Sequence, residues 1–97
     1  MTLEELTTQL TKMAEKSPNA LGGSILKFSF PEGVVRIDEN GKVSNEDKEA
    51  DCTISTSLSD LQKIISGDLN PMSAVMFGKI KIKGDMGVAM KLQSLMG

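Results

Sequence analysis

The residues that are able to do chemistry in this chain are few and scattered. The sequence contains no histidine and a single cysteine, Cys52. Histidine is the commonest general base near neutral pH and the commonest metal ligand, so serine–histidine and cysteine–histidine nucleophiles are excluded. Cys52 stands beside Ile54 in an alternating segment, which favours burial as a small hydrophobic residue over reactivity. We therefore expect no catalytic nucleophile.

Acidic residues are densest in one segment, which carries Glu46, Asp47, Glu49 and Asp51. Carboxylates bind divalent cations when they converge, but an acidic run on a loop is usually solvated. Residues 38–41 lack the ligand spacing of a calcium loop, and Asn40-Gly41 predicts a type I′ hairpin turn there. We expect no metal, no cofactor and no enzymatic activity.

The composition is that of an ordinary globular domain. The 97 residues are 39% hydrophobic and 25% charged, which predicts a single domain over residues 1–97 that folds alone. A net charge of −2 gives no general attraction to nucleic acid. No segment approaches the roughly 20 apolar residues that span a bilayer, and we expect no signal peptide among the first residues. Since a lone cysteine suits a reducing compartment, we predict a cytoplasmic protein.

The first half of the chain predicts a helix followed by antiparallel strands. Thr2-Leu3-Glu4-Glu5 has the form of a capping box, and apolar residues then recur at helical spacing until Pro18 ends the helix. Alternation of apolar and polar residues next predicts four strands, over residues 24–30, 34–38, 42–45 and 51–56. The first three of these strands should form an antiparallel meander.

The second half predicts three helices and one more strand. Ser57 is placed to cap a helix that ends at Gly67, and Asn70-Pro71 begins a short helix that ends at Gly78. Residues 79–83 alternate as a fifth strand, after which Asp85 caps a final helix. The order helix, four strands, two helices, strand, helix predicts an α+β fold.

The last two helices carry more apolar surface than packing requires. At helical spacing, the apolar positions of the final helix spread over an arc of roughly 220°. Most of the seven methionines fall in these helices, namely Met72, Met76, Met86, Met90 and Met96. Methionine moulds to variable apolar shapes. The pattern alone leaves open a ligand pocket, an irregular core and a dimer interface.

Three lysines, Lys79, Lys81 and Lys83, share one face of the predicted fifth strand. Lysines on an edge strand prevent aggregation with other chains. With Lys91 they would also attract anionic membranes or lipid head groups. Both interpretations stay open, and the second predicts transient membrane contact.

Two segments resemble the C-terminal signature of the sterol carrier protein type 2 domain. They read GDLNPMSA over residues 67–74 and GKIKIKGDMGVAMKLQ over residues 78–93. The upstream ADCTI, over residues 50–54, resembles that family as well. The resemblance extends from Ala50 to Leu95, roughly half of the chain, and continues in element order before it.

The resemblance implies a five-stranded, mainly antiparallel sheet covered on one side by helices, with an apolar tunnel between them. It implies a lipid-binding or lipid-transfer module that takes a sterol, fatty acid, fatty acyl-CoA or phospholipid without a cofactor. Separately, we expect a monomer. Where family members usually carry an aromatic pair and Gln, this chain has Val75-Met76-Phe77. The candidate lipid-binding residues are Leu61, Ile65, Val75, Met76, Phe77, Ile82, Met86, Met90 and Leu95.

The alternative function is a protein interaction module. The apolar helices of the C-terminal half would then form a homodimer or dock a partner protein.

Overall fold

The computed structural model describes residues 2–17 and 19–96, with side chains described as far as Lys91. The chain begins with helix α1 (Leu3–Lys16), and the predicted capping box is present. The Thr2 hydroxyl accepts from the Glu5 N–H at 3.1 Å, and the Glu5 carboxylate accepts from the Thr2 N–H at 3.2 Å. Three strands follow, β1 (Leu26–Phe30), β2 (Gly33–Ile37) and β3 (Val43–Ser44).

The second half contains β4 (Cys52–Ser55), α2 (Leu58–Ser66), α3 (Pro71–Met76), β5 (Lys81–Gly84) and α4 (Met86–Met96). Both predicted N-caps of the short helices are formed. The Ser57 hydroxyl accepts from the Asp60 N–H at 3.0 Å, and the Asn70 side chain accepts from the Met72 N–H at 2.8 Å. The predicted element order and α+β class are therefore confirmed.

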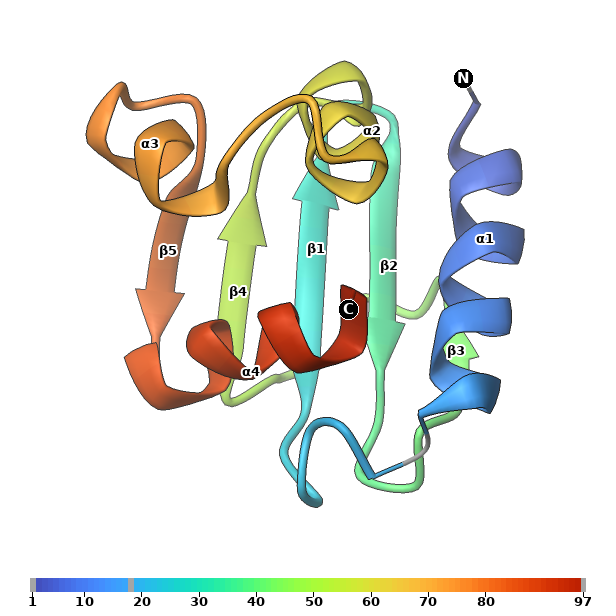
Figure 1. Ribbon diagram of the computed structural model, residues 1–97. Coiled ribbons are helices and arrows are strands. Elements are labelled where there is room, and N and C mark those ends of the chain that lie inside the picture. Colours follow the sequence, from blue (N-terminus) through green and yellow to red (C-terminus); the bar gives the residue numbers. More distant parts are fainter. Residues whose placement is uncertain (1, 18, 97) are drawn as a thin grey trace.

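The five strands form one mixed sheet in the order β3-β2-β1-β4-β5 (Figure 1). The pairs β1–β2, β2–β3 and β4–β5 are antiparallel, whereas β1 and β4 run parallel. The sheet is thus mainly antiparallel, as predicted. The parallel pair places β4 beside β1, and β5 pairs with the other side of β4, so β5 is an edge strand.

The helices cover the face of the sheet that carries its apolar residues. Helix α1 contacts β2 and β3 at one end of the strand order, and α4 contacts β4 and β5 at the other end (Figure 1). On β1 the burial alternates, with Leu26, Phe28 and Phe30 buried and the two residues between them half-buried. Leu6 and Leu10 of α1 pack into this core with no exposed surface. Among the described residues, no helix has the length and apolar character that crossing a bilayer requires.

The turn between β2 and β3 differs from the prediction. A type I′ turn requires positive φ at both central residues, but here only Gly41 has one, at 79°. The Gly41 N–H donates to the Asp38 carbonyl at 3.0 Å, and the Asp38 carboxylate accepts from the Asn40 and Lys42 N–H groups. The type I′ prediction was wrong because these side-chain hydrogen bonds stabilise a three-residue loop that ends in a left-handed glycine.

Candidate functional site

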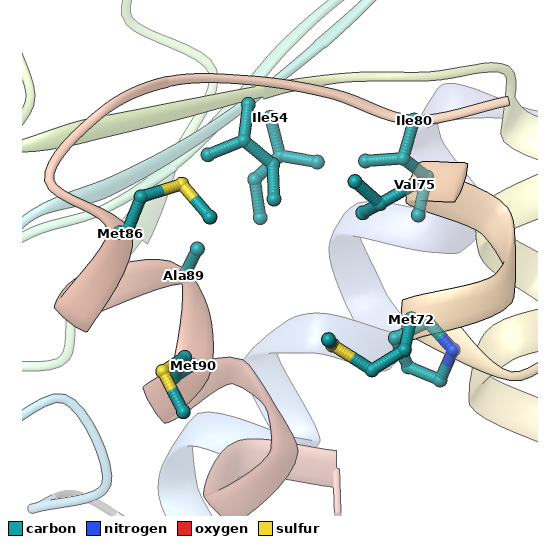
Figure 2. A pocket seen from close by; sticks show the side chains of 9 residues that line it. Ile54, Met72, Val75, Ile80, Met86, Ala89 and Met90 are labelled. Carbon is teal, nitrogen blue, oxygen red and sulfur yellow. The ribbon is translucent and has the colours of Figure 1, made fainter. Parts of the chain in front are cut away.

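An apolar pocket lies between the sheet and the two C-terminal helices. Figure 2 shows Val75 and Met72 on one side and Met86, Ala89 and Met90 on the other. The pocket has a volume of about 100 Å³. Every lining residue is apolar, and the set is Ile54, Pro71, Met72, Val75, Ile80, Ile82, Met86, Ala89 and Met90.

The sheet supplies one wall of the pocket through the pairing of its last two strands. Ile54 of β4 stands directly opposite Ile82 of β5 in the antiparallel register. Ile80, which directly precedes β5, is buried and lines the same pocket as Ile82. The Thr56 hydroxyl donates to the Lys79 carbonyl at 3.1 Å and holds the segment that leads into β5 beside the end of β4.

Helix α3 is held at its middle by backbone hydrogen bonds. The carbonyl of Ala74, a fully buried residue, accepts from the N–H groups of Lys79 at 2.9 Å and Ile80 at 3.3 Å. These bonds tie the helix to the chain that leads into β5. The side of α3 that carries Met72 and Val75 is thereby fixed toward the pocket.

Helix α4 supplies the opposite wall and is held at both ends of its described part. The Asp85 carboxylate accepts from the Gly87 N–H at 2.8 Å, which caps the helix as predicted. Farther along, the Lys91 ammonium donates to the Leu21 carbonyl and the Ser24 hydroxyl, both at 3.3 Å. Val88 of this helix is buried in the core, and the next two residues, Ala89 and Met90, line the pocket.

Below α4 the only cysteine of the chain, Cys52, is fully buried on β4. Burial raises the pKa of its thiol, and the nearby Asp85 carboxylate raises that pKa further. The thiol is thus held in its neutral form, as expected of a small hydrophobic residue. In the part of the chain that the structure describes, no group of three potential metal ligands converges.

The structure places four of the nine predicted lipid-binding residues around the pocket, namely Val75, Ile82, Met86 and Met90. Leu61 lies in the core with no exposed surface, and Ile65 packs against that core. Met76 and Phe77 lie outside the pocket with 85% and 77% of their surfaces exposed. The predicted Leu95 falls among side chains outside the described ones.

Five lining residues were absent from the prediction, namely Ile54, Pro71, Met72, Ile80 and Ala89. Alternation had already placed Ile54 and Ile80 on the inward faces of their strands. What alternation omits is the pairing of β4 with β5, which sets Ile54 opposite Ile82. Met72 follows from the helical spacing of three residues that brings it beside Val75.

The predicted tunnel has a smaller counterpart in the structure. Pockets for small molecules usually enclose about 300 to 1,000 Å³. The pocket of about 100 Å³ lies below that range, and it opens to the surface beside Met72, Met86 and Met90, whose side chains are more than half exposed. The pocket occupies the predicted place between sheet and helices, and the tunnel itself stays a prediction.

Comparison with known proteins relates the chain to one family of domains. The profile of the SCP-2 sterol transfer family matches residues 3–97. Sterol carrier protein 2 of Oryctolagus cuniculus is 41% identical over 98% of this chain, which corresponds to 19% of that protein. This chain therefore spans about a fifth of the length of the curated relatives it matches.

Two solved structures have the same fold. The sterol carrier protein domain 2 of Helicoverpa armigera is 34% identical, with a TM-score of 0.76, 95% of this chain and 83% of that chain covered. A palmitated sterol-carrier-type protein of Aedes aegypti is 21% identical, with a TM-score of 0.78, 99% of this chain and 95% of that one covered. At that lower identity the likeness concerns the fold alone.

Proposed function

Because the chain belongs to the SCP-2 sterol transfer family, we propose that it binds the hydrocarbon part of a lipid in the pocket between the sheet, α3 and α4. The ligand would be a sterol, fatty acid, fatty acyl-CoA or phospholipid. The observation that supports this proposal most directly is the all-apolar lining of the pocket. Such a lining stabilises a hydrocarbon by removing it from water and offers nothing to a polar molecule.

The size of the pocket adds a step to this proposal. A space of about 100 Å³ is too small for most of these ligands, so α3 and α4 would have to move apart when a lipid enters. Met72, Met86 and Met90 line the walls that would separate. Their unbranched side chains have several rotatable bonds, which allow them to pack against either the empty or the filled pocket.

We propose that the domain carries its ligand without changing it. No side chain that lines the pocket is titratable, so the pocket supplies no general acid or base to a bound lipid. The proposal further includes a monomer of one domain over residues 1–97, in the cytoplasm, where a free thiol such as that of Cys52 is stable.

We also propose that Lys79, Lys81 and Lys83 bring the domain to anionic membranes. All three side chains are exposed on or beside β5. Each lysine near an anionic surface contributes about 1 kcal/mol to membrane binding. These contacts would be transient, which suits a carrier that takes up lipid from one membrane and leaves again.

Mass spectrometry tests lipid binding directly. Freshly purified protein analysed under native conditions should carry an additional mass that denaturation releases and lipid extraction identifies. Titration with a fluorescent fatty-acid probe should then show binding. If the protein carries no lipid and binds neither fatty-acid nor sterol probes, the proposal is wrong.

A variant that fills the pocket tests its location. Ala89→Phe adds a ring to a lining position and should weaken probe binding about tenfold or more, because the ring occupies the space of the ligand. Ala50→Phe makes the same change at a half-buried position outside the pocket and serves as the matched control. Equal affinities of the two variants would place the ligand elsewhere.

A further inference from the structure

The large apolar side chains that the described part of the chain leaves exposed are gathered in one place. They are Met72, Val75, Met76, Phe77, Met86 and Met90, all on α3, its C-cap or α4. We call five of them, without Val75, the apolar rim. Single exposed apolar residues are common, whereas a contiguous group of this kind marks an interaction surface.

The apolar rim surrounds the mouth of the pocket and extends beyond it. One face of α3 carries Met72 together with Val75 and Met76, which follow it by three and four residues. The first two line the pocket, and Met76 continues the same face past the pocket. Phe77 follows at the C-cap, where its N–H donates to the Ser73 carbonyl at 2.9 Å.

Met76 and Phe77 are therefore apolar without serving the pocket or the core. They are 85% and 77% exposed, which makes them the two most exposed members of the rim. The buried Ala74 anchors the helix that carries them. A short anchored helix with an apolar tip is suited to enter the boundary between lipid head groups and acyl chains.

The charges next to this tip have one sign. From Leu69 to Gly84 the sequence contains Lys79, Lys81 and Lys83 and no acidic residue, although the whole chain has a net charge of −2. We call these three residues the lysine edge. Within the described residues, the ion pairs Lys27–Asp47 and Lys48–Glu46 do not involve it. The side chains of Lys81 and Lys83 point to the face of β5 opposite Ile82 and the pocket. Since β5 is an edge strand, the lysine edge and α3 still lie at one margin of the molecule (Figure 1).

We infer that the apolar rim and the lysine edge form one docking surface for anionic bilayers, with Met76 and Phe77 inserted between the lipids. A second copy of the chain would bring three more lysines with the same surface against one neighbouring acidic residue, Asp85 beside Met86, so the net positive charge complements an anionic bilayer instead. This inference rests on the proposed function, because docking in this way turns the mouth of the pocket toward the lipid that it would take up.

A tryptophan reporter tests the insertion. The chain contains no Trp, so Phe77→Trp supplies a single fluorophore at the tip, and Lys12→Trp supplies a matched one on an exposed position of α1. On adding phosphatidylcholine vesicles that contain phosphatidylserine, the emission of the Phe77→Trp variant should shift to the blue and be quenched by brominated acyl chains. The emission of the Lys12→Trp variant should remain that of a solvated indole. A shift for Lys12→Trp alone, or for neither variant, overturns the inference.

Changes of charge and of apolar surface test the two parts of the docking surface. Replacing the lysine edge by Lys79→Gln, Lys81→Gln and Lys83→Gln should weaken binding to the anionic vesicles about 100-fold. The matched control removes as many exposed lysines elsewhere, at Lys12, Lys16 and Lys63, and should have a much smaller effect. Phe77→Ser should weaken vesicle binding about tenfold. Equal losses in the two lysine triples overturn the inference.

Measurements in solution separate this inference from the proposed function. If the protein binds a fatty-acid probe without vesicles but the indole of the Phe77→Trp variant never enters a bilayer, the docking surface is wrong and lipid binding stands. If that indole enters the bilayer but no probe binds, the docking surface stands and the proposed ligand pocket is wrong. Light scattering that shows a dimer dissociated by Phe77→Ser would replace the bilayer by a second copy and overturn the inference.

Discussion

Apolar residues are buried to different degrees in two regions of the molecule, the one around β1 and β2 and the one around β5, α3 and α4. Around β1 and β2, the residues that alternate inward are buried under α1 and α2, and Phe28 and Leu6 have no exposed surface. Around β5, α3 and α4, residues of the same kind remain exposed, and Met90 keeps 70% of its surface in solvent. Both regions have capped helices and paired strands.

The difference indicates two uses for the same apolar chemistry. In the first region, apolar surface stabilises the fold because other parts of the chain cover it. In the second region, the surface has no partner within the described residues, so its contribution to folding is small. A contiguous exposed apolar surface of this kind is typical of a site that binds a ligand, a membrane or another protein.

The largest expected contrast is between two phenylalanines. Phe28→Ala removes a fully buried ring from the core and should lower the free energy of unfolding by about 3 to 5 kcal/mol. Phe77→Ala removes a ring that is 77% exposed and should change that free energy by no more than about 0.5 kcal/mol. Urea unfolding followed by circular dichroism measures both. Similar losses for the two variants would mean that Phe77 packs within the protein.

Within the second region, two glycines with positive φ differ in how closely the rest of the chain packs around them. Gly84 ends β5 with a φ of 107°, and a Cβ there would lie 2.5 Å from the Asp51 carbonyl oxygen. Gly78 follows α3 with a φ of 74° and open space around it. We expect Gly84→Ala to cost about 2 to 3 kcal/mol and Gly78→Ala about 1 kcal/mol. Thermal unfolding distinguishes them, and the reverse order would contradict the described packing at β5.

Loss of the N-cap should destabilise the whole fold in the case of α2 and only the helix itself in the case of α3. Ser57→Ala removes the cap of α2, which packs in the core, and should lower the free energy of global unfolding by about 1 kcal/mol. Asn70→Ala removes the cap of α3 and should act locally, because that helix buries little besides Ala74. Hydrogen exchange should show faster exchange in α3 alone for Asn70→Ala. A global loss as large as that of Ser57→Ala would contradict this expectation.

The smallest expected effect concerns Cys52 and pH. Burial raises the pKa of its thiol in the folded state above the ordinary value of 9.0. The stabilisation that results is complete below the pKa of the unfolded state and is lost as pH rises from there through the folded pKa. Cys52→Ala should lose less stability than the wild type as pH rises above about 9. Parallel curves for the two proteins would show that the thiol does not titrate on unfolding.

The sequence predicted the order of elements because local signals determine it. The capping box at Thr2, the N-caps Ser57 and Asn70, and the alternation in β1 each act within a few residues. The geometry of the Asn40-Gly41 turn was missed because Asp38 accepts hydrogen bonds across the loop, a contact that competes with the turn preference of Asn-Gly.

The candidate site was predicted only in part because it depends on distant segments. Spacing identified the apolar helices, but the pairing of Ile54 with Ile82 joins residues that no local pattern relates. Met76 and Phe77 were predicted to line the pocket, together with Val75, because the family resemblance implied that the short helix walls the tunnel. Their position outside the pocket follows from the anchoring of α3 at Ala74, which is a tertiary contact.

Nuclear magnetic resonance of the methionine methyl groups tests the central claim most directly, because methionines occur in both regions. On addition of oleate, the account predicts large shifts for Met72, Met86 and Met90, which line the pocket, and no shift for Met13 of α1, which packs against the core. Met76 should respond to anionic vesicles and hardly to oleate in solution. A shift of Met13 as large as those of the pocket methionines, or no shift at Met72, Met86 and Met90, would contradict the account.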